Sequence, residues 1–149
     1  MKILLILSAL FAVASPYTYQ KCELARVLQS NGLDGYQGYS LANWVCLVQY
    51  ESTYNTQAIG HNRKRGKIVS SDYGLFQINS YWWCDDGQTP NTHNGCQKNC
   101  ADFLNNDIND DIVCARRVVR DRQGMNAWNG WKNNCKGQDL SHFLDGCNI

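Results

Sequence analysis

The hydrophobic pattern of the chain predicts four helices. Apolar positions recur at helical spacing in 22–29, 41–51 and 110–120, and a shorter helix is expected over 127–133. The third of these begins with acidic residues and ends with basic ones, the order that a helix dipole favours. Ser40 stands directly before the second helix, where its hydroxyl can act as an N-cap.

The pattern changes between the second and third helices. Residues 56–79 are rich in Asn, Gly and Ser and contain short alternating runs, which are typical of a small antiparallel sheet built from hairpins. The expected fold class is therefore α+β, a helical lobe with a small β lobe inserted into it. A cleft between two such lobes is a natural place for an extended ligand.

The first residues predict export. Met1-Lys2 precedes an apolar run over 3–7, and small residues follow over 12–15. We interpret residues 1–16 as a secretory signal peptide, cleaved somewhere in 14–16, because the apolar run is too short to span a membrane. Residues 17–149 then form one secreted, extracellular domain, which we expect to be a monomer with no membrane anchor.

Charge and cysteine content narrow the class of protein further. Without Lys2 the mature chain has 13 basic and 13 acidic residues, and it has no nucleic-acid-binding motif, so we expect no nucleic-acid partner. Eight cysteines in a secreted chain of this length predict four disulfides, although spacing alone does not choose the pairing. A metal site at Cys96 and Cys100 is the competing interpretation, which secretion disfavours.

Two carboxylates are the candidate chemistry. Glu51 ends an apolar helical stretch that includes Trp44, and such packing favours the neutral acid. Asp72 lies in a polar segment with Gln77 and Asn79 downstream as hydrogen-bond donors, which favours its charged form. A protonated acid opposite an ionised carboxylate is the arrangement that cleaves glycosidic bonds. Taken singly, Glu51 also fits a solvated helix end, and Asp72 also fits an ordinary hairpin turn.

Several short segments carry a resemblance to a known family. They are Cys22-Glu23-Leu24-Ala25, Asn43-Trp44-Val45-Cys46, Asp72-Tyr73-Gly74, Gln77-Ile78-Asn79-Ser80, Trp82-Trp83-Cys84 and Gly124-Met125-Asn126-Ala127-Trp128. With the eight cysteines they cover the chain from about Tyr17 to its end, and the whole domain resembles the c-type lysozymes. Lysozyme is itself the standard example of the two-carboxylate arrangement.

The resemblance implies a fold, an activity and a disulfide pairing. It implies a lysozyme-like fold and a retaining glycosidase, requiring no cofactor, that cleaves the β-1,4 bond between N-acetylmuramic acid and N-acetylglucosamine in peptidoglycan or bonds in chitin-type oligosaccharides. Glu51 would be the general acid, Asp72 the nucleophile or ion stabiliser, and Trp128 the packing that keeps the acid protonated. The implied disulfides are Cys22–Cys147, Cys46–Cys135, Cys84–Cys100 and Cys96–Cys114.

The resemblance also implies a set of substrate-binding residues. Trp82 and Trp83 would stack on sugar rings, although adjacent tryptophans also fit a satellite core. Asp121 would contact the distal sugar, Asn79 and the backbone of Ala127 would hold an N-acetyl group, and Gln77 would support the site.

A polar segment before the third helix is a candidate calcium site. The plain interpretation is a loop whose acidic residues stabilise the start of that helix. The segment also resembles the loop of calcium-binding lysozymes and α-lactalbumins, whose ligands would fall on the side chains of Asn105, Asp110 and Asp111 and the backbone oxygens of Asp102 and Asp107. Those proteins have aspartate where this chain has Asn105, so a structural calcium would bind weakly.

Two further features bear on function. Arg63, Lys64, Arg65 and Lys67 place four cations within five residues, in a segment before Asp72 that is longer than in the common avian lysozymes. Such a run is either a solvated tip or a contact for an anionic polymer. The rival function class is a non-enzymatic relative such as the α-lactalbumins, which lack the catalytic pair present here.

Overall fold

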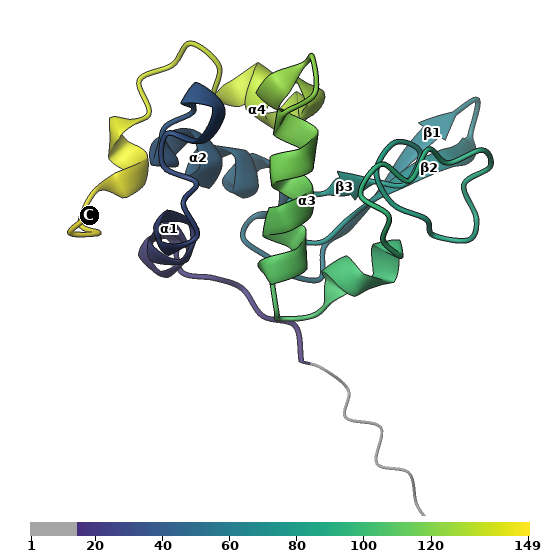
Figure 1. The fold of residues 1–149 in the computed structure, drawn as a ribbon, viewed down its shortest axis with the longest axis horizontal. Helices are drawn as coiled ribbons and strands as arrows, with labels where there is room; N and C mark the ends of the chain where they lie inside the picture. The colour runs from purple at the N-terminus through teal and green to yellow at the C-terminus, as the bar shows by residue number, and fades with distance from the viewer. Residues whose placement is uncertain (1–14) are drawn as a thin grey trace, which may run out of the picture.

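The computed structural model describes residues 15–149 (Figure 1). The expected signal peptide falls almost entirely on residues 1–14, which lie outside the described residues. Within residues 15–149, no helix is both long enough and apolar enough to cross a membrane.

The helical lobe contains the four predicted helices, three of them within one residue of their expected bounds. They are α1 (Lys21–Ser30), α2 (Leu41–Ser52), α3 (Asn109–Val119) and α4 (Asn129–Asn134), with 3-10 turns η1 (Tyr36–Gly38), η2 (Cys100–Leu104), η3 (Gly124–Ala127) and η4 (Ser141–Leu144). The helix expected over 127–133 begins later than predicted, because Trp128 has an extended backbone, with φ −100° and ψ 115°.

The N-terminus of α2 corrects one sequence prediction. Ser40 precedes the helix, but its side chain makes no capping hydrogen bond. Instead, Oδ1 of Asp34 accepts a hydrogen bond from the N–H of Leu41, with 2.9 Å between the two atoms. A charged carboxylate from the preceding loop is the stronger acceptor, and the Ser40 hydroxyl accepts from the side chain of Asn43.

The β lobe is a three-stranded antiparallel sheet in the order β1-β2-β3. Its strands are β1 (Ile59–Lys64), β2 (Lys67–Tyr73) and β3 (Ile78–Asn79). In Figure 1 the β1–β2 hairpin extends away from the helices, on the far side of α3 from α1. The register places Asp72 of β2 opposite Gly60 of β1 and Asn79 of β3, so this aspartate has a strand on each side.

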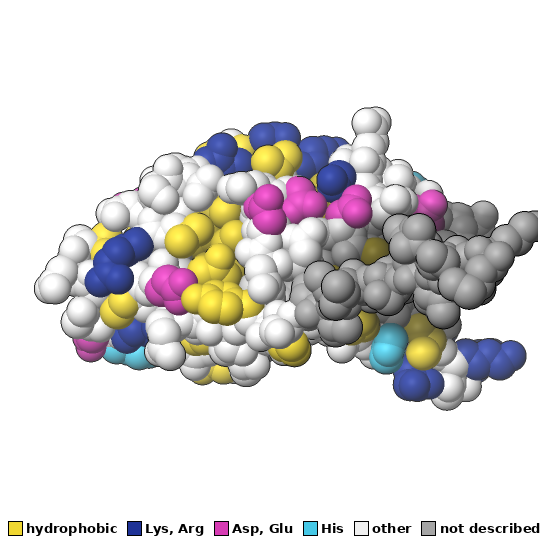
Figure 2. All heavy atoms as spheres, turned by 90° about the horizontal axis from the view of Figure 1, so that it is seen from below, with side chains coloured by type: hydrophobic (Ala, Val, Ile, Leu, Met, Phe, Trp, Pro, Cys, Tyr) yellow, Lys and Arg dark blue, Asp and Glu magenta, His cyan; other side chains and the backbone are white. Residues whose placement is uncertain are grey.

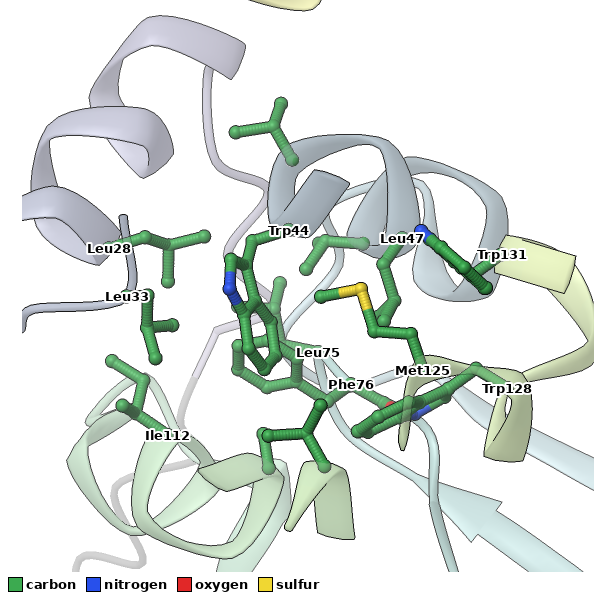
Figure 3. Packing of buried hydrophobic residues seen from close by; sticks show 14 of the residues in the cluster. Leu28, Leu33, Trp44, Leu47, Leu75, Phe76, Ile112, Met125, Trp128 and Trp131 are labelled. Atoms are coloured by element: carbon green, nitrogen blue, oxygen red, sulfur yellow. The ribbon is translucent and has the colours of Figure 1, made fainter. Parts of the chain in front are cut away.

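One hydrophobic core joins the two lobes (Figure 3). Leu75 and Phe76, from the turn between β2 and β3, are fully buried among side chains of the helical lobe. The Phe76 and Trp44 rings meet edge to face, with centroids 6.3 Å apart. The turn itself requires glycine: Gly74 has a φ of 75°, and a Cβ atom there would collide with the Phe103 carbonyl. The lobes are therefore fixed to each other by packing at this turn.

Four disulfides confirm the pairing that the resemblance implies. They join Cys22 to Cys147, Cys46 to Cys135, Cys84 to Cys100 and Cys96 to Cys114. The first ties the two ends of the domain together. Each such link stabilises a domain by about 2–4 kcal/mol.

Candidate active-site cleft

A cleft of about 1140 Å³ lies between the helical lobe and the sheet. Every cleft residue expected from the sequence lines it. These residues are Glu51, Asp72, Gln77, Asn79, Trp82, Trp83, Asp121, Ala127 and Trp128. They come from α2, β2, the segment around β3, and the region between α3 and α4, so the fold brings together side chains that are distant in sequence.

Glu51 projects into the cleft from the last turn of α2. Burial raises the pKa of its carboxyl, and the negative charge of Asp72 raises it further, while the backbone N–H groups of Gly130 and Trp131 lower it. The N–H of Gly130 donates to Oε1 of Glu51 at 2.8 Å. The net direction is upward, which confirms that the surroundings of Glu51 favour the neutral acid.

Gly130 allows this contact because it has no side chain. A Cβ atom at position 130 would lie 2.6 Å from Oε1 of Glu51, a distance shorter than the contacts that Cβ atoms make in proteins. Gly130 was not among the residues that the sequence pointed to, since a single glycine in a helix carries no functional signal. It positions the acid from α4, far away in the sequence.

Trp128 forms an apolar part of the cleft wall. Its side chain is buried, and its indole N–H donates to the backbone oxygen of Phe76 at 2.7 Å. Its ring meets that of Trp44 edge to face, with centroids 6.4 Å apart. A tryptophan anchored at its polar end presents a fixed apolar surface, and this surface lies in the same cleft as the acid.

Asp72 corrects one prediction and confirms another. Asn79 donates to Oδ1 of Asp72 at 2.8 Å, as expected, and Asn62 donates to Oδ2 at 2.8 Å. Burial nevertheless raises the pKa of Asp72, and these two amides and the nearby His61 only partly offset it. The prediction that the surroundings favour the charged form was wrong in net direction, because desolvation of the carboxylate outweighs two neutral donors.

Gln77 lines the cleft without donating to Asp72. Its side-chain N–H groups donate to the backbone oxygens of Ala58 and Gly74, each at 3.0 Å. The side chain therefore ties the start of β1 to the turn after β2. Its part in the site is to brace the sheet next to Asp72.

Trp82 and Trp83 differ in their surroundings. Trp82 is 53% exposed at the cleft edge, and one face of its ring stacks on the imidazole of His93, with centroids 4.8 Å apart and planes at 10°. Trp83 is half-buried, with the Arg117 guanidinium 5.3 Å from its ring centroid. The satellite-core interpretation therefore fails for Trp82, whose apolar ring stands open to a ligand.

Several cleft-lining residues were missed by sequence reasoning. They include Asn62, Val69, Tyr81, Asn91, Arg122 and Asn129. Asn62 pairs with Ser70, two residues before Asp72, so its side chain lies on the same face of the sheet as the carboxylate. Strand alternation could have found it only once the register was known, and a bulge after Asn62 shifts that register.

The candidate calcium loop lies below the start of α3, on the face where Figure 2 shows a row of acidic side chains. Asp111 is fully buried, neither oxygen of its carboxyl has a hydrogen-bond partner among residues 15–149, and burial raises its pKa to about 9. Asp102 and Asp110 instead face the ammonium group of Lys98, at 3.5 and 3.6 Å. Within residues 15–149, no three His, Cys, Asp or Glu side chains converge as a metal site.

The amide of Asn105 is already engaged within this loop. It donates to the backbone oxygen of Asp102 and accepts from the N–H of Asp107. The residues thus fit a cation in part, because a cation can pair with the unpaired carboxyl of Asp111. The other expected side-chain ligands are engaged, since Lys98 pairs with Asp110 and the loop's own hydrogen bonds hold Asn105.

Comparison with known proteins identifies the family. A profile of the C-type lysozyme/alpha-lactalbumin family matches residues 17–147. The milk isozyme of lysozyme C from Bos taurus is 53% identical over 131 residues, which cover 88% of this chain and 86% of the relative. Lysozyme C-1 from Mus musculus is 50% identical and lysozyme C-2 from Sus scrofa 48% identical, each over the whole of both chains. The chain therefore belongs to the C-type lysozyme/alpha-lactalbumin family.

Proposed function

We propose that this protein is a retaining glycoside hydrolase that cleaves the β-1,4 bond between N-acetylmuramic acid and N-acetylglucosamine in peptidoglycan. Its relatives are lysozymes C, and peptidoglycan hydrolysis is their general activity. The observation that carries the proposal is that Glu51 and Asp72 open into one cleft from two lobes. The non-enzymatic members of the family lack this pair.

The two carboxyls divide the acid and base roles by their surroundings. Asp72 loses its proton first, because Asn79 and Asn62 donate to its two oxygens and His61 favours its negative charge. That charge then raises the pKa of Glu51, which keeps its proton. Two such groups titrate as a coupled pair, so the reactive state has one proton, held by Glu51.

The reaction follows from this protonation state. Oε1 of Glu51 accepts from Gly130, which leaves Oε2 to donate the proton to the glycosidic oxygen. The C–O bond breaks, and the Asp72 carboxylate bonds to or stabilises the anomeric carbon. Glu51, now a carboxylate, takes a proton from the water that attacks this carbon. Two displacements on opposite faces retain the configuration.

The remaining cleft residues bind the polymer. Trp82 offers an open ring face to a sugar, and Trp83 lies beside it. Asn79 and the backbone of Ala127 hold an N-acetyl group, and Asp121 contacts a more distant sugar. Chitin-type oligosaccharides, which share the N-acetylglucosamine units, bind in the same way. The enzyme acts as a monomer and outside the cell, after loss of residues 1–16, in keeping with its four disulfides.

The loop before α3 supports a second proposal, that calcium binds there and stabilises the fold. The unpaired, buried carboxyl of Asp111 favours a cation nearby. Asp110, Asn105 and the backbone oxygens of Asp102 and Asp107 would complete the ligand set. A bound calcium would supply positive charge to this loop and takes no part in hydrolysis.

The product of hydrolysis tests the proposed function. Digestion of purified peptidoglycan should release new reducing ends that are N-acetylmuramic acid, and proton NMR of chitohexaose cleavage should first detect the β-anomer. An initial α-anomer would contradict the retaining mechanism. No turnover of either substrate would place the protein with the non-enzymatic members of the family.

A further inference from the structure

The tip of the β1–β2 hairpin has an unusual turn. Lys64 and Lys67 form the last pair of the ladder, and Arg65 and Gly66 connect them with φ angles of 51° and 78°. Positive φ at both central residues is the pattern of a type I′ turn, which favours Asn, Asp or Gly at its first central position. An arginine there is conformationally unfavourable, so the turn geometry does not explain why this residue is a cation.

The tip is also strongly basic, with four cations in residues 63–67. Residues 61–69 are all exposed, and in the described part of the chain no carboxylate lies within ion-pair distance of Arg63, Lys64, Arg65 or Lys67. Of the 13 basic residues in 17–149, these four leave only nine elsewhere against 13 acidic residues. Figure 2 shows Lys and Arg side chains projecting at the lower right, at the end of the molecule toward which this hairpin extends in Figure 1.

The tip is continuous with the cleft. Lys64 and Val69 line the same cavity as Asp72, while Arg65 and Lys67 stand beyond it. A polymer leaving the cleft on this side would therefore meet the cations of the tip next. The two tip arginines, Arg63 and Arg65, can each form paired hydrogen bonds with a phosphate group. A phosphodiester also keeps its negative charge over the whole pH range in which Glu51 and Asp72 share one proton.

We propose that the hairpin tip is a second binding site, for a phosphodiester polymer attached to the wall glycan that occupies the cleft. The proposal rests on the proposed function only for the identity of the glycan. Attraction between the tip and such a polymer would be screened over a Debye length of about 10 Å at 0.1 M salt. It would concentrate the enzyme on walls that carry the polymer without changing the chemistry at Glu51.

A pair of matched double variants tests this site. Arg65→Asn with Lys67→Ser removes two tip cations that do not line the cleft, and asparagine suits the turn better than arginine. Lys132→Ser with Lys136→Ser removes the same charge from exposed positions in and just after α4. Binding of each protein to purified poly(glycerol phosphate) is measured by calorimetry at 20 and 200 mM salt, and cleavage of uncharged chitohexaose is measured alongside.

The tip variant should bind poly(glycerol phosphate) at least five-fold more weakly than the control variant at 20 mM salt, and the difference should shrink at 200 mM. Chitohexaose cleavage should be the same in both variants, which separates this site from the proposed hydrolysis. Equal binding by the two variants would overturn the proposal, since net charge alone would then suffice. The proposal would also be overturned if the wild-type protein bound anionic lipid vesicles but not the polymer. In that case the tip, which has the half-exposed Ile68 and Val69 beside it, would bind a membrane surface.

Discussion

The side-chain amide of Asn62 on β1 donates a hydrogen bond to Oδ2 of Asp72 on β2, with 2.8 Å between nitrogen and oxygen. Asn79 on β3 donates to the other oxygen at the same distance. Each oxygen of the carboxylate therefore has a donor from a different neighbouring strand. Both hydrogen bonds stabilise the charged form against the desolvation that raises the pKa of Asp72.

This arrangement predicts the effect of Asn62→Ala on the pH profile. Hydrolysis of chitohexaose should have an acid limb from Asp72 and an alkaline limb from Glu51, because burial raises both pKa values above those of free carboxyls. Loss of the Asn62 donor should raise the pKa of Asp72 further, which moves the acid limb to higher pH and leaves the alkaline limb in place. Asn91→Ala, elsewhere in the cleft, is the control; an unmoved acid limb would remove Asn62 from this role.

Gly130→Ala should reduce activity without unfolding the protein. The added methyl group would overlap Oε1 of Glu51, so the acid must move. A displacement of about 1 Å at a catalytic group can slow a reaction by roughly 100-fold. Alanine is otherwise favoured over glycine in a helix, and Asn133→Ala in the same helix serves as the control. Wild-type kcat in Gly130→Ala would show that the position of Glu51 tolerates this change.

His93→Ala should weaken substrate binding more than it slows turnover. The imidazole stacks on the Trp82 ring, which is still 53% exposed, while Tyr81 meets both rings edge to face. Aromatic pairs of this kind contribute about 0.5–1.5 kcal/mol, so KM for chitohexaose should rise roughly 2-fold to 10-fold with kcat nearly unchanged. His142→Ala, on η4, is the control. A lower kcat at unchanged KM would contradict this positioning role.

Calcium should raise the melting temperature slightly, because a ligand that binds only the folded state stabilises it. Asn105→Asp should enlarge the shift by adding a negative charge to the loop. Lys98→Gln should enlarge it too, by removing the ammonium that faces Asp102 and Asp110. Scanning calorimetry with calcium and with a chelator measures both effects. Identical melting temperatures for all three proteins under the two conditions would eliminate the site.

The sequence predicted the larger features because they depend on periodicity and on residue type. Helices α1 to α3 follow from apolar spacing and the antiparallel sheet from its alternating, turn-rich pattern, while the expected lining of the cleft came from the family resemblance. The details that failed depend on contacts and burial that exist only in the folded protein. Asp34 caps α2 in place of Ser40, and the net pKa direction of Asp72 depends on how deeply the folded cleft buries it.

The positions of Gly130 and Asn62 illustrate the same limit. Gly130 matters only because α4 brings its backbone within hydrogen-bond distance of Glu51, 79 residues earlier in the chain. Asn62 matters only because a bulged register places it diagonally across from Asp72. Neither relationship has a local pattern that would indicate it in the sequence.

Cleavage of bacterial cell walls by Glu51→Gln tests the central claim most directly. The amide fills the same space, and it can still accept from Gly130, but it cannot donate the proton that the leaving oxygen needs. Wild-type protein should clear a suspension of walls, and Glu51→Gln should lose at least about 100-fold in rate while its circular dichroism and melting temperature stay close to those of wild type. Substantial lysis by a folded Glu51→Gln protein would contradict the account.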